Sequence, residues 1–147
     1  MPNAESTPET LHDQHLESTL ASVDASEEIA KTVAARLGFD EESVYHIGYA
    51  VREAVVNAVV HGNLYSANKR VHLVMERLDR WLQVAVEDEG QGFEETGQAD
   101  PLAEENLLSQ SGRGILIIRA FMDEVTIGRA PGGGTRILMR KSLPATS

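Results

Sequence analysis

The 147-residue chain contains no cysteine, and only 5% of its residues are aromatic. Without cysteine it has neither a disulfide framework nor thiolate ligands for a metal, which is compatible with a reducing compartment. No apolar run reaches the roughly 18–20 residues that cross a membrane. The N-terminal segment MPNAESTPET also lacks the basic and apolar parts of a signal peptide. We therefore expect a cytoplasmic protein that is not bound to a membrane.

Basic residues are scarce as well, because 13 Lys and Arg stand against 23 Asp and Glu. The formal net charge of −10 argues against direct binding of nucleic acid, which depends on basic side chains that neutralise phosphates. A hydrophobic content of 41% and this length suit one soluble domain with a single core.

The hydrophobic pattern predicts one domain over 13–143, between a flexible acidic tail at 1–12 and a short C-terminal tail at 144–147. The expected elements, in order, are a strand at 15–22, helices at 26–37 and 41–62, strands at 69–77 and 81–88, a helix at 115–122, and a hairpin of 124–130 with 135–141. This order favours an α/β fold, a two-layer sandwich in which one mixed or antiparallel sheet is covered on one face by three helices.

The segment 94–111, EETGQADPLAEENLLSQS, is polar and acidic, and it is too long for an ordinary connection. An irregular segment of this length in a compact domain is usually a functional lid or disordered. It lies between two glycine motifs, and we therefore expect a lid.

A polar stripe runs along the helix predicted at 41–62. Glu53, Asn57 and His61 recur at every fourth position, beside an apolar seam rather than opposite it. A carboxylate and a carboxamide at the edge of a buried surface cost desolvation energy unless they bind something. Their oxygens suit a hard cation such as Mg²⁺, and the carboxylate can also accept a proton. A helix edge that merely meets solvent gives the same pattern.

Three glycine-bearing segments follow this helix. Glycines end strands, begin helices and form turns routinely, so each segment alone is weak evidence. The segments are D-x-G-x-G with Asp88, Gly90 and Gly92, then Gly112-Arg113-Gly114 before an apolar run, and Gly132 to Thr135 between two strand-like runs.

In this order after E-x-x-x-N, these motifs resemble the GHKL ATPase superfamily of gyrase, Hsp90, histidine kinases and MutL, whose fold is the Bergerat-type sandwich. Within it the chain is similar to the bacterial anti-sigma factor serine/threonine protein kinases. The resemblance covers roughly 15–141, and 111–125 is its most family-specific stretch. It implies a histidine-kinase-like ATP-binding domain.

The resemblance also implies a role for each motif residue. Asp88 would accept a hydrogen bond from the adenine amino group, assisted by Thr135, while Gly90 and Gly92 let the backbone approach the ring. Glu53 would act as general base or orient the attacking hydroxyl, and Asn57 would coordinate Mg²⁺. The phosphates would lie against a helix N-terminus formed by Gly112, Arg113 and Gly114, where Arg113 is equally well explained as a surface residue.

The leading hypothesis is an ATP-dependent serine/threonine kinase that silences a sigma factor and phosphorylates a serine of an anti-sigma-antagonist protein. By resemblance its partners are that sigma factor and that antagonist, and members of the family are often homodimers. A second hypothesis is an ATP-binding anti-sigma module with little or no kinase activity. Some kinases of this family carry a basic residue at the position of Gln110, and 94–111 contains no Lys or Arg. A third, an isolated histidine kinase catalytic domain, is disfavoured because no histidine lies in a recognisable H-box.

Overall fold

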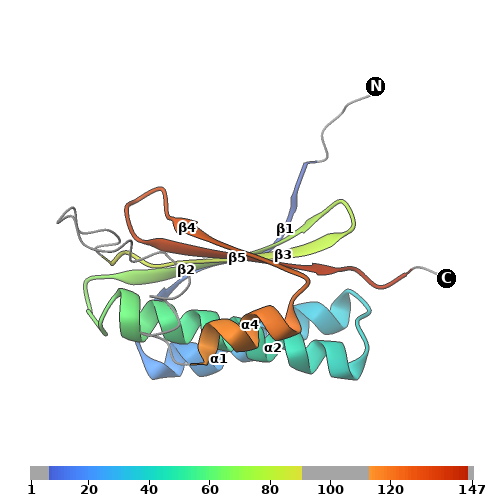
Figure 1. Ribbon diagram of the computed structural model, residues 1–147, viewed down its shortest axis with the longest axis horizontal. Helices are drawn as coiled ribbons and strands as arrows, with labels where there is room; N and C mark the ends of the chain where they lie inside the picture. The colour runs from blue at the N-terminus through green and yellow to red at the C-terminus, as the bar shows by residue number, and fades with distance from the viewer. Residues whose placement is uncertain (1–6, 91–112, 146–147) are drawn as a thin grey trace.

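In the computed structural model, which describes residues 7–90 and 113–145, the chain folds into a sheet layer and a helix layer (Figure 1). The sheet has five strands in the order β1-β2-β3-β5-β4, and every neighbouring pair is antiparallel. The strands are β1 (Glu9–Glu17), β2 (Arg70–Leu78), β3 (Trp81–Glu87), β4 (Glu124–Arg129) and β5 (Thr135–Ser142). The predicted α/β class is confirmed, and the sheet is the antiparallel alternative of the two expected.

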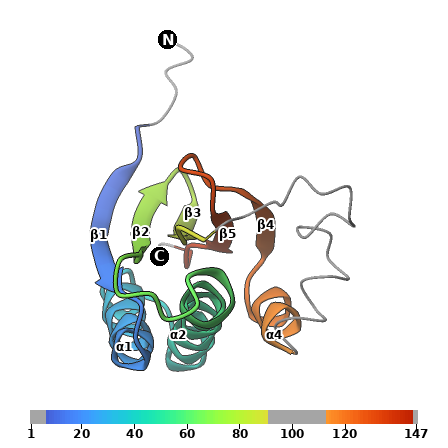
Figure 2. The ribbon, with the colours of Figure 1, turned by 90° about the vertical axis from the view of Figure 1, so that its left-hand side faces the viewer.

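The helices lie on one face of this sheet. Among the described residues they are α1 (Leu20–Arg36), α2 (Glu41–Val56) with its continuation η1 (Asn57–Gly62), and α4 (Gly114–Phe121). Figure 2 shows α1, α2 and α4 side by side, with α1 near β1 and α4 near β4. This arrangement agrees with the predicted sandwich of three helices against one sheet.

The core lies between the two layers, where strand alternation and helix periodicity meet. In β2 the side chains of Val71, Leu73 and Met75 are buried, because alternate residues of a strand point to the same face. The apolar seam predicted for the second helix faces them and is buried throughout. It consists of Ile47, Val51, Ala54, Val55 and Ala58.

The N-terminal boundaries differ from the prediction. The first strand begins at Glu9 and ends at Glu17, so part of the predicted tail 1–12 and only part of the predicted strand 15–22 are β1. The first helix begins at Leu20, because the Thr19 side chain accepts a hydrogen bond from Ser22 N and caps it. Ser26, the predicted start, is buried inside the helix and donates its hydroxyl to the carbonyl of Val23.

The second helix is also not uniform. It begins at Glu41 as predicted, capped by Asp40, but the six residues from Asn57 to Gly62 form a π-helix. A π-helical turn contains more residues than an α-helical turn, and such turns are frequent at functional sites. The regular spacing that predicted the polar stripe therefore ends at Asn57.

No helix in the described parts of the chain is both long and apolar enough to cross a membrane. The predicted lid at 94–111 lies outside the described residues.

Candidate functional site

Four segments from distant parts of the sequence lie at one end of the molecule. They are η1, the end of β3, the turn between β4 and β5, and the start of α4, all on the left in Figure 1. All of the predicted site residues that the structure describes belong to these segments or, in the case of Glu53, to the last turn of α2.

Asp88 is the most buried charged residue at this end, with 7% of its surface exposed. It comes directly after β3, and its Oδ1 accepts hydrogen bonds from Gly90 N at 2.9 Å and Thr135 N at 3.0 Å. Its own N–H donates to the Thr135 carbonyl at 3.0 Å. Because two N–H groups already bind Oδ1, Oδ2 is the oxygen that can accept a hydrogen bond from a ligand.

Three glycines surround the Asp88 carboxylate closely. A Cβ added to Gly62 would collide with Oδ2, and one added to Gly134 would collide with the Asp88 carbonyl oxygen. A Cβ on Gly90 would collide with the Gly62 carbonyl, so η1 and the segment after β3 also touch each other here. The close approach is therefore available only to glycine at these positions.

The environment of Asp88 changes its ionisation. Burial raises the pKa of this carboxyl above its ordinary value, and the hydrogen bonds from Thr135 and Gly90 partly oppose the rise. A buried carboxylate that keeps its charge is stabilised when a further hydrogen-bond donor binds its free oxygen. An exocyclic amine such as that of adenine has the required chemistry, whereas the carbonyl that guanine presents at the same ring position does not.

Glu53 and Asn57 lie along the helix that leads to this carboxylate. Glu53 is in the last turn of α2, and Asn57 is the residue at which the π-helix begins. The Nδ2 atom of Asn57 is buried and has no hydrogen-bond partner within the described residues. An unpaired buried amide is costly, and this one is consistent with a side chain arranged for a ligand.

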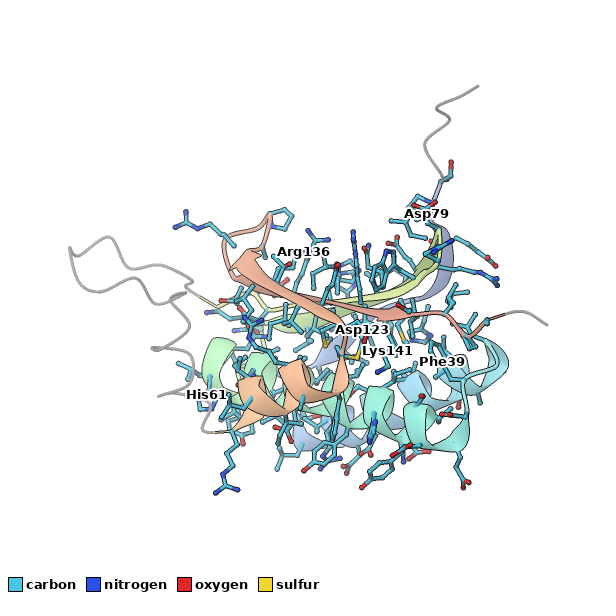
Figure 3. The ribbon with its side chains drawn as sticks, turned by 45° about the vertical axis from the view of Figure 1, so that its right-hand side comes forward. Phe39, His61, Asp79, Asp123, Arg136 and Lys141 are labelled. Atoms are coloured by element: carbon cyan, nitrogen blue, oxygen red, sulfur yellow. The ribbon has the colours of Figure 1, made fainter. Side chains whose placement is uncertain are left out.

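The Glu53 carboxyl is half-buried. Burial raises its pKa, and the positive charge of neighbouring Arg52 lowers it in part. A raised pKa brings a carboxylate closer to the range in which it can accept a proton during a reaction. His61, the third member of the predicted stripe, is exposed at the far end of η1, as Figure 3 shows.

The structure describes only some of the remaining predicted site residues. Thr135 begins β5 and pairs with Asp88 through its backbone, as described above. Arg113 is exposed and precedes the first residue of α4, Gly114, which is buried. Gly92 and Gly112 lie outside the described residues, as does Gln110.

Three residues that surround Asp88 were missed as site residues by the sequence reasoning. Gly62 and Asn63 end the helix, and Gly134 precedes Thr135 in the turn. Each has an ordinary local explanation as a helix end or a turn glycine, and their contacts with the Asp88 segment depend on the fold. The available signals were the glycine at which the predicted helix ends and the glycine run from Gly132 to Gly134.

The described residues contain no group of three or more His, Cys, Asp or Glu side chains that could hold a metal ion. A metal bound here would therefore take most of its ligands from a nucleotide and water. This is the usual mode of Mg²⁺, which binds through one or two protein oxygens and substrate phosphates. The Asn57 side chain has the chemistry for that role only in its carbonyl oxygen Oδ1, because the unpaired Nδ2 is a donor and does not bind a cation.

The chain is similar to known proteins in both sequence and fold. Residues 16–141 match the histidine kinase-like ATPase domain. The Anti-sigma F factor of Bacillus subtilis strain 168 is 32% identical over 138 residues, which is 90% of this chain and 93% of that protein. The Anti-sigma F factor of Clostridium novyi is 35% identical over 104 residues, 69% of this chain and 73% of that protein.

The fold has a counterpart among solved structures. The crystal structure of the RsbU and RsbW domains of Rv1364c from Mycobacterium tuberculosis superposes with a TM-score of 0.64 and 20% identity. The match covers 92% of this chain, which spans about a third (34%) of that one. The chain thus belongs to the histidine kinase-like ATPase domain family, and within it to the group of proteins similar to anti-sigma F factors. The resemblance recognised in the sequence is confirmed.

Proposed function

We propose that this protein is an ATP-dependent serine/threonine kinase that also acts as an anti-sigma factor and phosphorylates a serine of an anti-sigma-antagonist protein. The observation that carries the proposal is the buried Asp88 carboxylate, enclosed by three glycines, with one oxygen saturated by backbone N–H groups. The names of the curated relatives, Anti-sigma F factor, support a sigma factor as partner.

In the proposed site, the four segments bind different parts of the nucleotide. Asp88 accepts a hydrogen bond from the adenine amino group, and Gly90 and Thr135 hold the carboxylate in place. Gly114 begins α4, and the positive end of this helix is assigned to the phosphate oxygens. Gly92, Gly112 and Arg113 are assigned to the same nucleotide by their motifs. Asn57 is the protein ligand of Mg²⁺, which would supply charge neutralisation on the phosphates.

Glu53 is the proposed catalytic residue. Its carboxylate accepts the proton of the substrate serine hydroxyl while the serine oxygen forms a bond to the γ-phosphorus. The bond between that phosphorus and the bridging oxygen breaks, and its electron pair leaves with ADP. The raised pKa of Glu53 suits a group that must take up this proton.

An ATP-binding anti-sigma module with little or no kinase activity is the second candidate. It is favoured by Gln110, a neutral residue ahead of the SGRG motif, and by the lack of Lys and Arg throughout 94–111. Both candidates require the Asp88 site, and they differ only in whether phosphate is transferred.

A phosphate-transfer assay separates the two candidates. Radiolabelled γ-phosphate is followed from ATP onto antagonist proteins encoded near the gene, with the antagonist serine replaced by alanine as a control. We expect label on the wild-type antagonist alone. ATP-dependent capture of a sigma factor without transfer to any antagonist would instead support the binding module. A protein that binds neither ATP nor a sigma factor would contradict both.

A further inference from the structure

Asn63 is the residue after η1, and both polar atoms of its side-chain amide form hydrogen bonds within the protein. It is 1% exposed. Its Nδ2 donates to Ser18 Oγ at 2.9 Å and to the Arg70 carbonyl at 3.0 Å, and its Oδ1 accepts from Glu89 N at 2.8 Å. The side chain thus joins the end of β1, the start of β2 and the residue after Asp88.

The chemistry of these partners fixes the orientation of the amide. The Glu89 N–H can only donate, so the atom facing it must be the amide oxygen. The Ser18 hydroxyl donates its proton to the Lys69 carbonyl at 2.6 Å, so its oxygen receives the Nδ2 proton. A flipped amide would place two donors together at Glu89 and two acceptors together at Arg70.

The Asn63 bond to Glu89 lies one residue away from the close contact between Gly62 and Asp88. Gly62 precedes Asn63 and lies against Asp88 Oδ2, while Glu89 follows Asp88. The bond therefore ties the end of η1 to the end of β3 beside the carboxylate. The backbone that follows Asn63 differs from that of a simple turn. Leu64 and Tyr65 both adopt the left-handed conformation, with φ of 52° and 60°.

The reversal of the chain after Asn63 is itself held by hydrogen bonds. Tyr65 N donates to the Val59 carbonyl at 2.9 Å, and Ser66 N donates to the Asn63 carbonyl at 2.9 Å. Two consecutive non-glycine residues in this region of φ are uncommon and persist only where the surroundings determine them. These two hydrogen bonds hold the backbone where η1 ends, and neither of them involves Asp88.

We propose that Asn63 is a positioning residue for base recognition, which holds Oδ2 of Asp88 where it can accept a hydrogen bond from an adenine amino group. Thr135 and Gly90 fix Oδ1 by hydrogen bonds, and Asn63 ties the backbone next to Gly62, which lies against Oδ2, to Glu89, the residue after Asp88. A hydrogen bond weakens steeply when its acceptor moves, so loss of this tie reduces selectivity for adenine. The inference rests on the proposed function, since it presupposes that Asp88 binds adenine.

The test compares the ratio of ATP and GTP affinities, because phosphate contacts are common to both nucleotides and cancel in the ratio. The test variant is Asn63→Ala, which removes all three hydrogen bonds. Ser18→Ala is the matched control, since it removes one bond of the same amide but leaves the Glu89 bond intact. Isothermal calorimetry gives the affinities, and circular dichroism checks folding at the same temperature.

We expect the ATP-over-GTP ratio to fall about five- to tenfold in Asn63→Ala and to stay within about twofold of wild type in Ser18→Ala. A purely structural role would instead lower stability in both variants and leave the ratio unchanged in the folded protein. If Asn63→Ala is partly unfolded, the measurement is repeated in trimethylamine N-oxide, which favours the compact state.

The outcomes for this inference and for the proposed function can be told apart. A wild-type protein that does not distinguish ATP from GTP contradicts the adenine site itself. A selective wild type with an equally selective Asn63→Ala variant contradicts only the positioning role. A Ser18→Ala variant as unselective as Asn63→Ala also overturns it, because the Glu89 bond would then not be the operative one.

Discussion

Asp88 and Thr135 form a reciprocal pair in which each backbone N–H binds an oxygen of the other residue. Asp88 N donates to the Thr135 carbonyl at 3.0 Å, and Thr135 N donates to Asp88 Oδ1 at 3.0 Å. The second bond is made to the side chain, so the register of β3 and β5 determines the orientation of the carboxylate. The start of one strand thus aligns the side chain at the end of another.

The first prediction concerns Asp88→Asn, which keeps the shape and the acceptor Oδ1 but removes the charge. We expect the dissociation constant for ATP to rise about 10- to 150-fold, because a charge-assisted hydrogen bond contributes about 1.5–3 kcal/mol. The preference for ATP over GTP should disappear in the same calorimetric titrations. Unchanged ATP affinity would show that Asp88 does not bind the base.

The second prediction is that Asp88→Asn stabilises the nucleotide-free protein at neutral pH. Burial raises the pKa of Asp88 in the folded state, so the folded protein binds the proton more tightly than the unfolded chain does. The ionised carboxylate therefore destabilises the fold above its folded-state pKa, and this penalty vanishes below the unfolded value of about 3.8. The midpoint of thermal unfolding should be higher for the variant at pH 7, and the difference should shrink toward pH 4. A lower midpoint at pH 7 would contradict the argument.

The third prediction uses two glycines of the same turn. A Cβ at Gly134 would collide with the Asp88 backbone carbonyl, whereas one at Gly132 meets nothing within 4 Å. We expect Gly134→Ala to lower the free energy of unfolding by about 1–3 kcal/mol and to weaken ATP binding, while Gly132→Ala changes neither appreciably. Urea unfolding followed by circular dichroism measures the first effect. Equal behaviour of the two variants would show that the turn adapts and that close approach to Asp88 is not required.

The fourth prediction concerns Asn57→Ala. The Nδ2 atom of Asn57 has no partner within the described residues, and alanine favours helices, so we expect a thermal midpoint within a few degrees of wild type. Binding of ATP in the presence of Mg²⁺ should weaken, whereas binding in EDTA should change little, because only the metal-dependent part is lost. A variant that binds ATP equally well with Mg²⁺ would remove Asn57 from the proposed metal site.

The fifth prediction concerns Glu53→Gln, which keeps the size of the side chain and removes its basicity. ATP affinity should stay nearly unchanged, while phosphate transfer to the antagonist slows by about 10²- to 10⁴-fold. In the wild type, transfer should decline as the pH falls through the raised pKa of Glu53, since the protonated carboxyl accepts no proton. Glu42→Gln, an exposed residue of the same helix, is the matched control. Full transfer by Glu53→Gln would assign the proton to another acceptor.

Most of the fold could be predicted because its signals are local. Alternation in the strand predicted at 69–77 agrees with the burial of Val71, Leu73 and Met75 in β2, and the apolar seam predicted the buried face of α2. The start of α1 could not be placed as well. Both Thr19 and Ser26 precede residues that favour helices, and only the packing of α1 against the sheet decides which of them caps it.

The candidate site, like the fold, was predicted from the sequence only in part. The motif residues Glu53, Asn57, Asp88 and Thr135 were found from their spacing and their resemblance to a family, and the spacing of Glu53 and Asn57 needs only helix geometry. The change to a π-helix at Asn57 was not predicted, because an inserted residue leaves the apolar pattern on both sides intact.

The sequence by itself determined the order of the helices and strands, the buried face of α2 and the chemical types available to the site, since these depend on patterns within short stretches. The tertiary structure alone decided that Gly62, Asn63 and Gly134 enclose the Asp88 segment. The bond from Glu89 to Asn63 joins residues 26 positions apart, and that from Thr135 to Asp88 joins residues 47 apart. Such contacts arise from strand register and from how η1 ends against the sheet, and no pattern within a short stretch of sequence records them.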